Sequence, residues 1–400
     1  MKSSKLLFTL HALIQKVKKN WGNFLGAFIV QSILILILSV EMILSMFPKL
    51  LFAFFIILCF IGLCYIIDIP LEKYTTRRRD IVLFATTIAD NVDKLIEPFS
   101  KVGIAWGTCI TLQKSPNLQE GWSFKEVEIE FERTIYPFEK KLEEKYNQFM
   151  NNNSGEFKDD GDKLMLTINP KAFDEAKTLT LKGQLTKYSR IIFFIEEVIN
   201  DVAERNKYIN SLFLTKDDIE FPHSLCIHAV ITTKDKKVLF VKRSPKVIYY
   251  PNKWAVSCEE SAQSTDLDNK NPILFWAKRL LKEELGVDEN DYSEENLRLL
   301  SVFLESEILN ITLCMILKLN ISSFLLDNIL KSHKKLDDEF IEWKFLTYEE
   351  AAALLLKPTI NFHPTTQYRI YMSLLHLWGF DKLKTYIIKL KKKVTIKIAD

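Results

Sequence analysis

The chain has 400 residues, of which 48% are hydrophobic and 26% charged, a composition that excludes intrinsic disorder and collagen-like or low-complexity fibres. Its net charge of +3 is unevenly distributed: residues 1–79 carry +7, residues 381–400 carry +5, and residues 80–380 carry −9. Because affinity for nucleic-acid polymers depends mainly on Lys and Arg contacts to phosphate, the acidic body argues against such a partner. The basic ends suit an anionic membrane surface. Six cysteines without a CxxC pair indicate reduced thiols, not a disulfide framework or a zinc site.

Two long apolar runs open the chain. Phe24–Phe47 would span about 36 Å as a helix, and Leu50–Ile67 about 27 Å. Pro48 and Lys49 alone separate them, so we expect a tight transmembrane hairpin within residues 1–70, preceded by an amphipathic segment. Lys and Arg before the first run and after the second place both termini in the cytoplasm by the positive-inside rule. The alternative is a pair of buried core helices in a soluble protein.

The first apolar run contains polar side chains that are candidates for a membrane path. Glu41 is its only charged residue and would sit about 9 Å from the outer end of the helix. Ionisable residues within membranes are functional candidates, although a carboxylate near a helix end can also snorkel to the interface. If several hairpins assemble, Glu41 and Gln31 would face a shared polar path.

Residues 71–215 contain no catalytic constellation. A helix is expected over Ile81–Ser100 and a strand over Ile104–Leu112, followed by helical periodicity over Phe124–Met150 with a kink at Pro137. A polar loop over residues 151–162 precedes an amphipathic helix expected at Tyr188–Lys207. We interpret the region as a helical connector or dimerisation region.

The pattern changes from Ser224 onward, where strands and helices alternate. Asn271 as N-cap and Pro272 at the first helical position predict a helix that ends at Gly286. Strands are predicted at Leu225–Thr232, Val238–Arg243, Leu297–Glu305, Ile308–Asn320 and Phe340–Leu346, with a helix between the last two strands and helices at Tyr348–Leu356 and Thr365–Trp378.

This order, together with the stretch Arg279-Leu-Leu-Lys-Glu-Glu-Leu-Gly-Val287, resembles the Nudix domain over Ser224–Trp378. The box of that family reads G-x5-E-x7-R-E-U-x-E-E-x-G-U, where U is apolar. The matching residues are Arg279, Leu281, Glu283, Glu284, Gly286 and Val287. The family's leading Gly, first Glu and the Glu after Arg are replaced by Thr265, Asn271 and Leu280. The resemblance implies an α/β/α sandwich with a mixed sheet in residues 216–380, followed by a basic tail over residues 381–400.

The departures bear on activity. In the family, the positions corresponding to 280, 283 and 284 lie on one helical face and hold the magnesium that assists attack on a diphosphate. With Leu280 in that set, Glu283 and Glu284 are left as a weak magnesium site, so no catalytic residue and no firm cofactor is assigned. Glu259 and Glu260, in the preceding loop, are candidates to compensate. We expect a pocket that binds a ligand without hydrolysing it.

The resemblance to a nucleotide-binding fold also suggests ligand contacts. Those expected for base stacking are Tyr249, Tyr250 and Trp254, and those expected for phosphate binding are Arg243, Lys253 and Arg279. Alternatives remain open: the three aromatic side chains can instead be buried against the sheet, and Arg279 can pair with Glu283 on the helix surface.

A two-helix membrane hairpin followed by a degenerate Nudix-like domain resembles the transmembrane effectors of bacterial cyclic-oligonucleotide anti-phage systems (CBASS). That resemblance implies a homo-oligomer of the cell inner membrane, which binds a cyclic nucleotide and then disrupts the bilayer. The alternatives are a membrane-anchored Nudix hydrolase of a nucleoside diphosphate derivative, and a structural membrane protein.

Overall fold

The computed structural model describes residues 105–106, 109–153, 155–157, 160–173, 177–214, 217–333, 339–356 and 361–399, all within one compact unit, Ile88–Asp400. The two apolar runs, with Gln31 and Glu41, lie outside the described residues, so the membrane hairpin stays a prediction. Among the described helices, none is both long and apolar enough to cross a bilayer.

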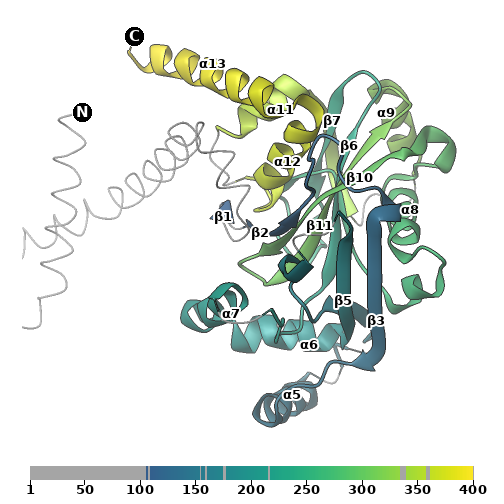
Figure 1. Ribbon diagram of the computed structural model, residues 1–400, viewed down its shortest axis with the longest axis vertical. Coiled ribbons are helices and arrows are strands. Elements are labelled where there is room, and N and C mark those ends of the chain that lie inside the picture. Colours follow the sequence, from purple (N-terminus) through teal and green to yellow (C-terminus); the bar gives the residue numbers. More distant parts are fainter. Residues whose placement is uncertain are drawn as a thin grey trace, which may run out of the picture. The chain divides into compact units, whose positions relative to one another are not determined.

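The described chain is organised around a nine-stranded mixed sheet, with the order β1-β2-β10-β11-β6-β7-β12 (Figure 1). Strand β9 pairs with β6, and β8 pairs with β7. The pair β11 and β6 is parallel, and the other pairs are antiparallel. The strands are β1 (Ala105–Trp106), β2 (Cys109–Lys114), β6 (Leu225–Thr232), β7 (Lys237–Arg243), β8 (Trp254–Val256), β9 (Cys258–Ser261), β10 (Tyr292–Glu305), β11 (Asn310–Leu319) and β12 (Phe340–Thr347).

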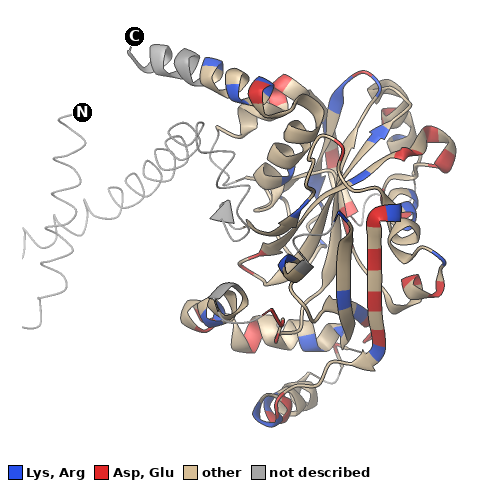
Figure 2. Cartoon of the chain, in the orientation of Figure 1, with Lys and Arg blue, Asp and Glu red and all other residues tan. Residues whose placement is uncertain are grey.

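A second, three-stranded sheet has the order β3-β5-β4, with β3 (Val127–Ile135), β4 (Asp162–Leu166) and β5 (Leu179–Lys187). Strand β3 alternates half-buried and exposed residues, and its exposed side chains include Glu128, Glu130 and Glu132, which appear as an acidic stripe in Figure 2. This alternation is that of a strand with one solvated face. The helical periodicity expected over Phe124–Met150 is therefore wrong for its first half.

Helices lie on both faces of the large sheet, with α8 on one side and α11 and α12 on the other (Figure 1). The α-helices are α5 (Lys140–Asn152), α6 (Tyr188–Phe193), α7 (Val202–Leu214), α8 (Pro272–Leu285), α9 (Ser323–Ser332), α11 (Tyr348–Leu354), α12 (Thr366–Trp378) and α13 (Phe380–Ala399). The helix expected over Tyr188–Lys207 is interrupted: a π-helical turn covers Phe194–Val198, and Ile199, which is buried, separates it from α7.

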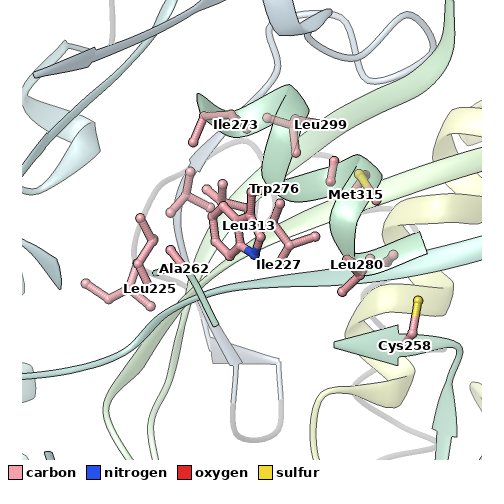
Figure 3. Close-up of a cluster of buried hydrophobic side chains, with 14 of the residues drawn as sticks. Leu225, Ile227, Cys258, Ala262, Ile273, Trp276, Leu280, Leu299, Leu313 and Met315 are labelled. Carbon is pink, nitrogen blue, oxygen red and sulfur yellow. The ribbon is translucent and has the colours of Figure 1, made fainter. Parts of the chain in front are cut away.

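The hydrophobic core is continuous between the two sheets. Strand β6 is buried along its whole length, which explains its nearly uninterrupted apolar sequence. In Figure 3, Ile227 of β6 and Leu313 of β11 lie beside Trp276 of α8. Leu164 of β4 and Leu181 of β5 belong to the same core cluster.

The region expected as a connector thus takes part in the C-terminal fold. Strand β2 is hydrogen-bonded to β10, where Cys109 faces Glu305 in the register. The strand expected over Ile104–Leu112 is confirmed by β1 and β2, and the expected helical character of the rest of the region holds for α5 to α7 and is wrong for β3 to β5. The domain boundaries drawn at residues 70, 215 and 380, and a dimerisation role, stay predictions.

Candidate functional site

A cavity of about 480 Å³ opens where β6 and β7 diverge. These two strands pair directly only at Thr232 and Val238; beyond that point β6 pairs with β9 and β7 pairs with β8. The cavity wall combines strands β4, β6, β7, β9, β10 and β11 with α6 and the loop after β7. Its lining includes Lys163, Tyr188, Ser224, Cys226, His228, Arg243, Lys246, Tyr249, Glu259, Glu260, Glu305, Asn310, Glu339 and His363.

Glu259 lies at the centre of a buried ion cluster next to this cavity. Its Oε1 forms an ion pair with Arg243 Nη1 at 2.9 Å and accepts a hydrogen bond from Arg369 Nη2 at 3.1 Å. Burial alone would raise the pKa of Glu259, but the positive charges of Arg243 and Arg369 outweigh burial and hold the pKa well below its usual range. The carboxylate is therefore ionised and its charge is compensated.

Two histidines flank the cluster. His228 Nε2 lies 3.4 Å from Glu259 Oε2 and 3.5 Å from Glu305 Oε1, and His363 Nε2 lies 3.6 Å from Glu259 Oε2. The Thr365 hydroxyl contacts Nδ1 of both rings, at 3.3 Å for His228 and 2.9 Å for His363. Burial lowers the pKa of His363 to about 3 and that of His228 well below its usual value, so both rings are neutral near pH 7.

Glu305 completes the cluster from β10. Burial and the Glu259 charge raise its pKa to about 8, so that this carboxyl is mostly protonated at pH 7. The Thr312 hydroxyl donates to Glu305 Oε1 at 2.9 Å.

Helix α8, which carries the Nudix-like box, has the predicted ends. The Asn271 side chain accepts a hydrogen bond from the Leu274 amide at 3.1 Å, and Gly286 ends the helix with φ +67°, in the left-handed region. Leu280 is fully buried in the hydrophobic core (Figure 3). The position that a metal-binding carboxylate would need is therefore part of the packing between α8 and the sheet.

The two remaining carboxylates of the box, Glu283 and Glu284, lie in different surroundings. Glu283 is exposed, and its backbone carbonyl contacts His333 Nε2 at 2.7 Å. Glu284 is half-buried; burial, with Glu339 and Glu259 as the next causes, raises its pKa to about 8. Within the described part of the chain, no group of three or more His, Cys, Asp or Glu has a metal-binding arrangement. The weak magnesium site at Glu283 and Glu284 stays a prediction.

Arg279 is held by acidic partners on the α8 side of the sheet. Its guanidinium pairs with Glu260, and Nη2 lies 2.9 Å from Asp266 Oδ2. The side chain is 12% exposed and is not part of the cavity lining. Glu283, the partner considered from the helical spacing, does not pair with it within the described residues.

Of the other side chains expected to bind ligand, Arg243 and Tyr249 line the cavity. Tyr250 donates through its hydroxyl to Glu307 Oε2 at 2.7 Å, and its ring packs edge-on against His363. Trp254 begins β8 and lies beneath the Lys344 ammonium, which is 3.9 Å from the ring centroid. Tyr250, Lys253 and Trp254 are not among the cavity-lining residues.

Sequence reasoning missed several residues of this site. Lys163 lies in a region interpreted as a connector, and His228 is embedded in an apolar strand. Arg369 lies in the helix predicted at Thr365–Trp378, to which no function was assigned, and it is fully buried. The remaining ones are Ser224, Glu305 and His363. Of these residues, only Arg369 carries a signal in the sequence: a charged side chain among apolar neighbours can indicate a buried ion pair.

No family model and no curated protein matches the chain. Solved structures that match the chain include DR0079 from Deinococcus radiodurans (16% identity over 37% of this chain and 81% of that chain, TM-score 0.28). A NUDIX hydrolase from Nitrosomonas europaea matches at 16% identity over 38% and 88%, with a TM-score of 0.27. A bifunctional NMN adenylyltransferase/ADP ribose pyrophosphatase from Francisella tularensis matches at 16% identity over 46% and 51%, also with a TM-score of 0.27. At these TM-scores the similarity carries no argument about the fold or the activity of this chain.

Proposed function

We propose that the chain is a membrane effector of bacterial antiviral defence whose Nudix-like domain binds a cyclic nucleotide signal without hydrolysing it. Ligand binding would drive assembly of a homo-oligomer, and the N-terminal hairpins would then disrupt the inner membrane. The cytoplasmic placement of both termini and the membrane path at Gln31 and Glu41 belong to this proposal.

The observation that supports binding without hydrolysis is the charge arrangement at the cavity. Its wall carries Lys163 and Arg243 together with aromatic side chains, which suit phosphate and base. The carboxylates that a metal would need are already compensated, Glu259 by Arg243 and Arg369, and Glu260 by Arg279. A hydrolytic centre that neutralises a diphosphate with magnesium requires carboxylates that are free to bind the ion.

Coupling to the membrane requires that the ligand bind the assembled state more tightly than the resting state. Assembly of the soluble parts would bring several hairpins to a high effective concentration in the bilayer. The hairpins would then associate without any change within a single hairpin. The binding site and the membrane segment would thus act in one chain as sensor and output.

The test uses the full-length protein in detergent micelles with a panel of cyclic di- and trinucleotides. Calorimetric titration measures binding, and light scattering coupled to size exclusion measures the mass of the protein. We expect one member of the panel to bind saturably and to increase the mass of the protein–micelle complex. No binding across the panel, or binding without any change in mass, would count against the proposal.

The alternative, a membrane-anchored hydrolase of a nucleoside diphosphate derivative, has one observation in its favour. Glu284 lies near Glu339 and Glu259, and a cation would relieve the repulsion that raises its pKa. Magnesium-dependent turnover of nucleoside diphosphate compounds that disappears in Glu284→Gln and persists in Glu349→Gln, at an exposed position on α11, would favour this alternative.

A further inference from the structure

The cavity contains polar atoms that have no partner within the described part of the protein. Ser224 and Tyr249 both line the cavity, and their hydroxyl oxygens are buried and make no hydrogen bond. Ser224 as a whole is 8% exposed. A buried hydroxyl without a partner destabilises the fold, so two of them beside one cavity indicate a ligand that would satisfy them.

Lys163 brings a cation to the same wall. Its ammonium donates to Ser261 Oγ at 3.0 Å, and no carboxylate among the described residues pairs with it. Burial lowers the pKa of Lys163, because removal from water disfavours the charged ammonium. An ammonium has three donors, so donors remain for a ligand after the bond to Ser261.

Lys163, Ser224 and Tyr249 all line the cavity, together with Cys226 of β6. The Cys226 thiol donates to the backbone carbonyl of Ser224 at 3.8 Å, and burial raises the pKa of this thiol, which keeps it protonated. The ammonium and the two hydroxyls therefore belong to residues that line one cavity.

We propose that Lys163, Ser224 and Tyr249 form an oxyanion subsite that binds a phosphate group of the ligand. An ammonium and two hydroxyls supply several donors and a positive charge, which is the complement of a phosphate with its strong acceptor oxygens. The subsite lies on the β6 strand away from the α8 box, and its cation comes from β4 of the smaller sheet. This inference rests on the proposed nucleotide-binding function and assigns the phosphate contacts that Lys253 and Arg279 were expected to make.

The experiment titrates inorganic diphosphate into the full-length protein in detergent micelles, in the absence of magnesium. We expect saturable binding to the native protein and a loss of affinity of at least about tenfold in Lys163→Met, because one charge-assisted bond is removed. Ser224→Ala and Tyr249→Phe each remove one donor and should weaken binding by about 3- to 10-fold. Lys182→Met is the matched control: it lies on the neighbouring strand β5, pairs with Glu130 at 2.6 Å, and should bind like the native protein.

The subsite is refuted if the native protein does not bind diphosphate saturably, or if Lys163→Met binds it as tightly as Lys182→Met does. A thermal melt of each variant checks folding. If Lys163→Met is poorly folded, Lys163→Arg is measured in its place; because it keeps the positive charge, it should bind diphosphate with part of the native affinity. Failure of the subsite is distinguishable from failure of the proposed function, since a cyclic nucleotide that binds native protein and Lys163→Met equally well refutes the subsite alone.

Discussion

Replacing Leu280 by glutamate would restore the carboxylate of the Nudix box, and the structure predicts that it destabilises the fold without creating a metal site. Leu280 is fully buried in the cluster that contains Trp276 and Ile227. Losing the burial of a leucine side chain costs about 1.5–3 kcal/mol. Placing an uncompensated carboxyl there adds about 1–3 kcal/mol even in its protonated form. The expected loss of about 3–6 kcal/mol is a large part of the roughly 5–15 kcal/mol that holds a typical domain folded.

The assay is urea unfolding at pH 7, followed by near-ultraviolet circular dichroism, with and without magnesium. Phe275→Glu on the same helix is the matched control, because Phe275 is 41% exposed and its substitution should cost under about 1 kcal/mol. A Leu280→Glu protein with native stability, or one that magnesium stabilises selectively, would show that position 280 can face an ion and that its burial in the core is not what excludes a metal.

Three further outcomes are expected. Folding raises the pKa of Glu284 from 4.5 to about 8, so the native protein should lose stability as the pH rises across that interval. Glu284→Gln should remove this part of the pH dependence. If urea titrations give the same difference in stability between variant and native protein at pH 5 and at pH 8.5, the prediction is wrong. Arg369→Met leaves part of the Glu259 charge uncompensated in the interior and should cost about 3–5 kcal/mol, whereas Arg133→Met, which breaks an exposed pair with Asp268, should cost under about 1 kcal/mol; equal melting temperatures for the two variants would argue against a structural role for the buried cluster. Glu41→Leu should preserve cyclic-nucleotide binding and reduce leakage of dye from vesicles if the carboxylate lines an assembled path, and undiminished leakage would remove that role while leaving assembly untouched.

The C-terminal strands and helices were predictable because their sequence patterns, such as apolar runs and helix-capping residues, agree with their burial in the folded domain. Strand β6 is a β-branched apolar run and matches the predicted Leu225–Thr232, and the cap at Asn271 and the stop at Gly286 bracket α8 as expected. Strand β3 was not predicted, since its three Glu and one Arg in nine residues resemble the charged sequence of a solvated helix, and only pairing with β5 selects the extended form.

The site was less predictable than the fold, because its residues converge from distant parts of the chain. Arg243 and Tyr249 were found from a basic and aromatic stretch near the Nudix-like box. Glu259 and Arg369 are far apart in sequence, and nothing local marks them as partners. The phosphate contact suggested by the position of Arg279 stays a prediction. The carboxylates of Glu260 and Asp266, which hold Arg279 in the structure, could not be foreseen from the sequence, because they become its neighbours only when β9, α8 and the intervening segment pack together.

The pairing of β2 with β10 gives the domain a mechanical property. Cys109 begins β2 and lies in register with Glu305, the β10 residue that borders the cavity. Tension applied along the chain from its N-terminal side would load β1 and then the β2–β10 hydrogen bonds, beginning at the residue pair that borders the cavity. Because strands loaded at a paired end separate one bond at a time, a weak pull could displace β2 while the rest of the sheet stays intact. Occupancy of the cavity should therefore change the force at which β2 detaches, a quantity that single-molecule pulling from the N-terminus can measure.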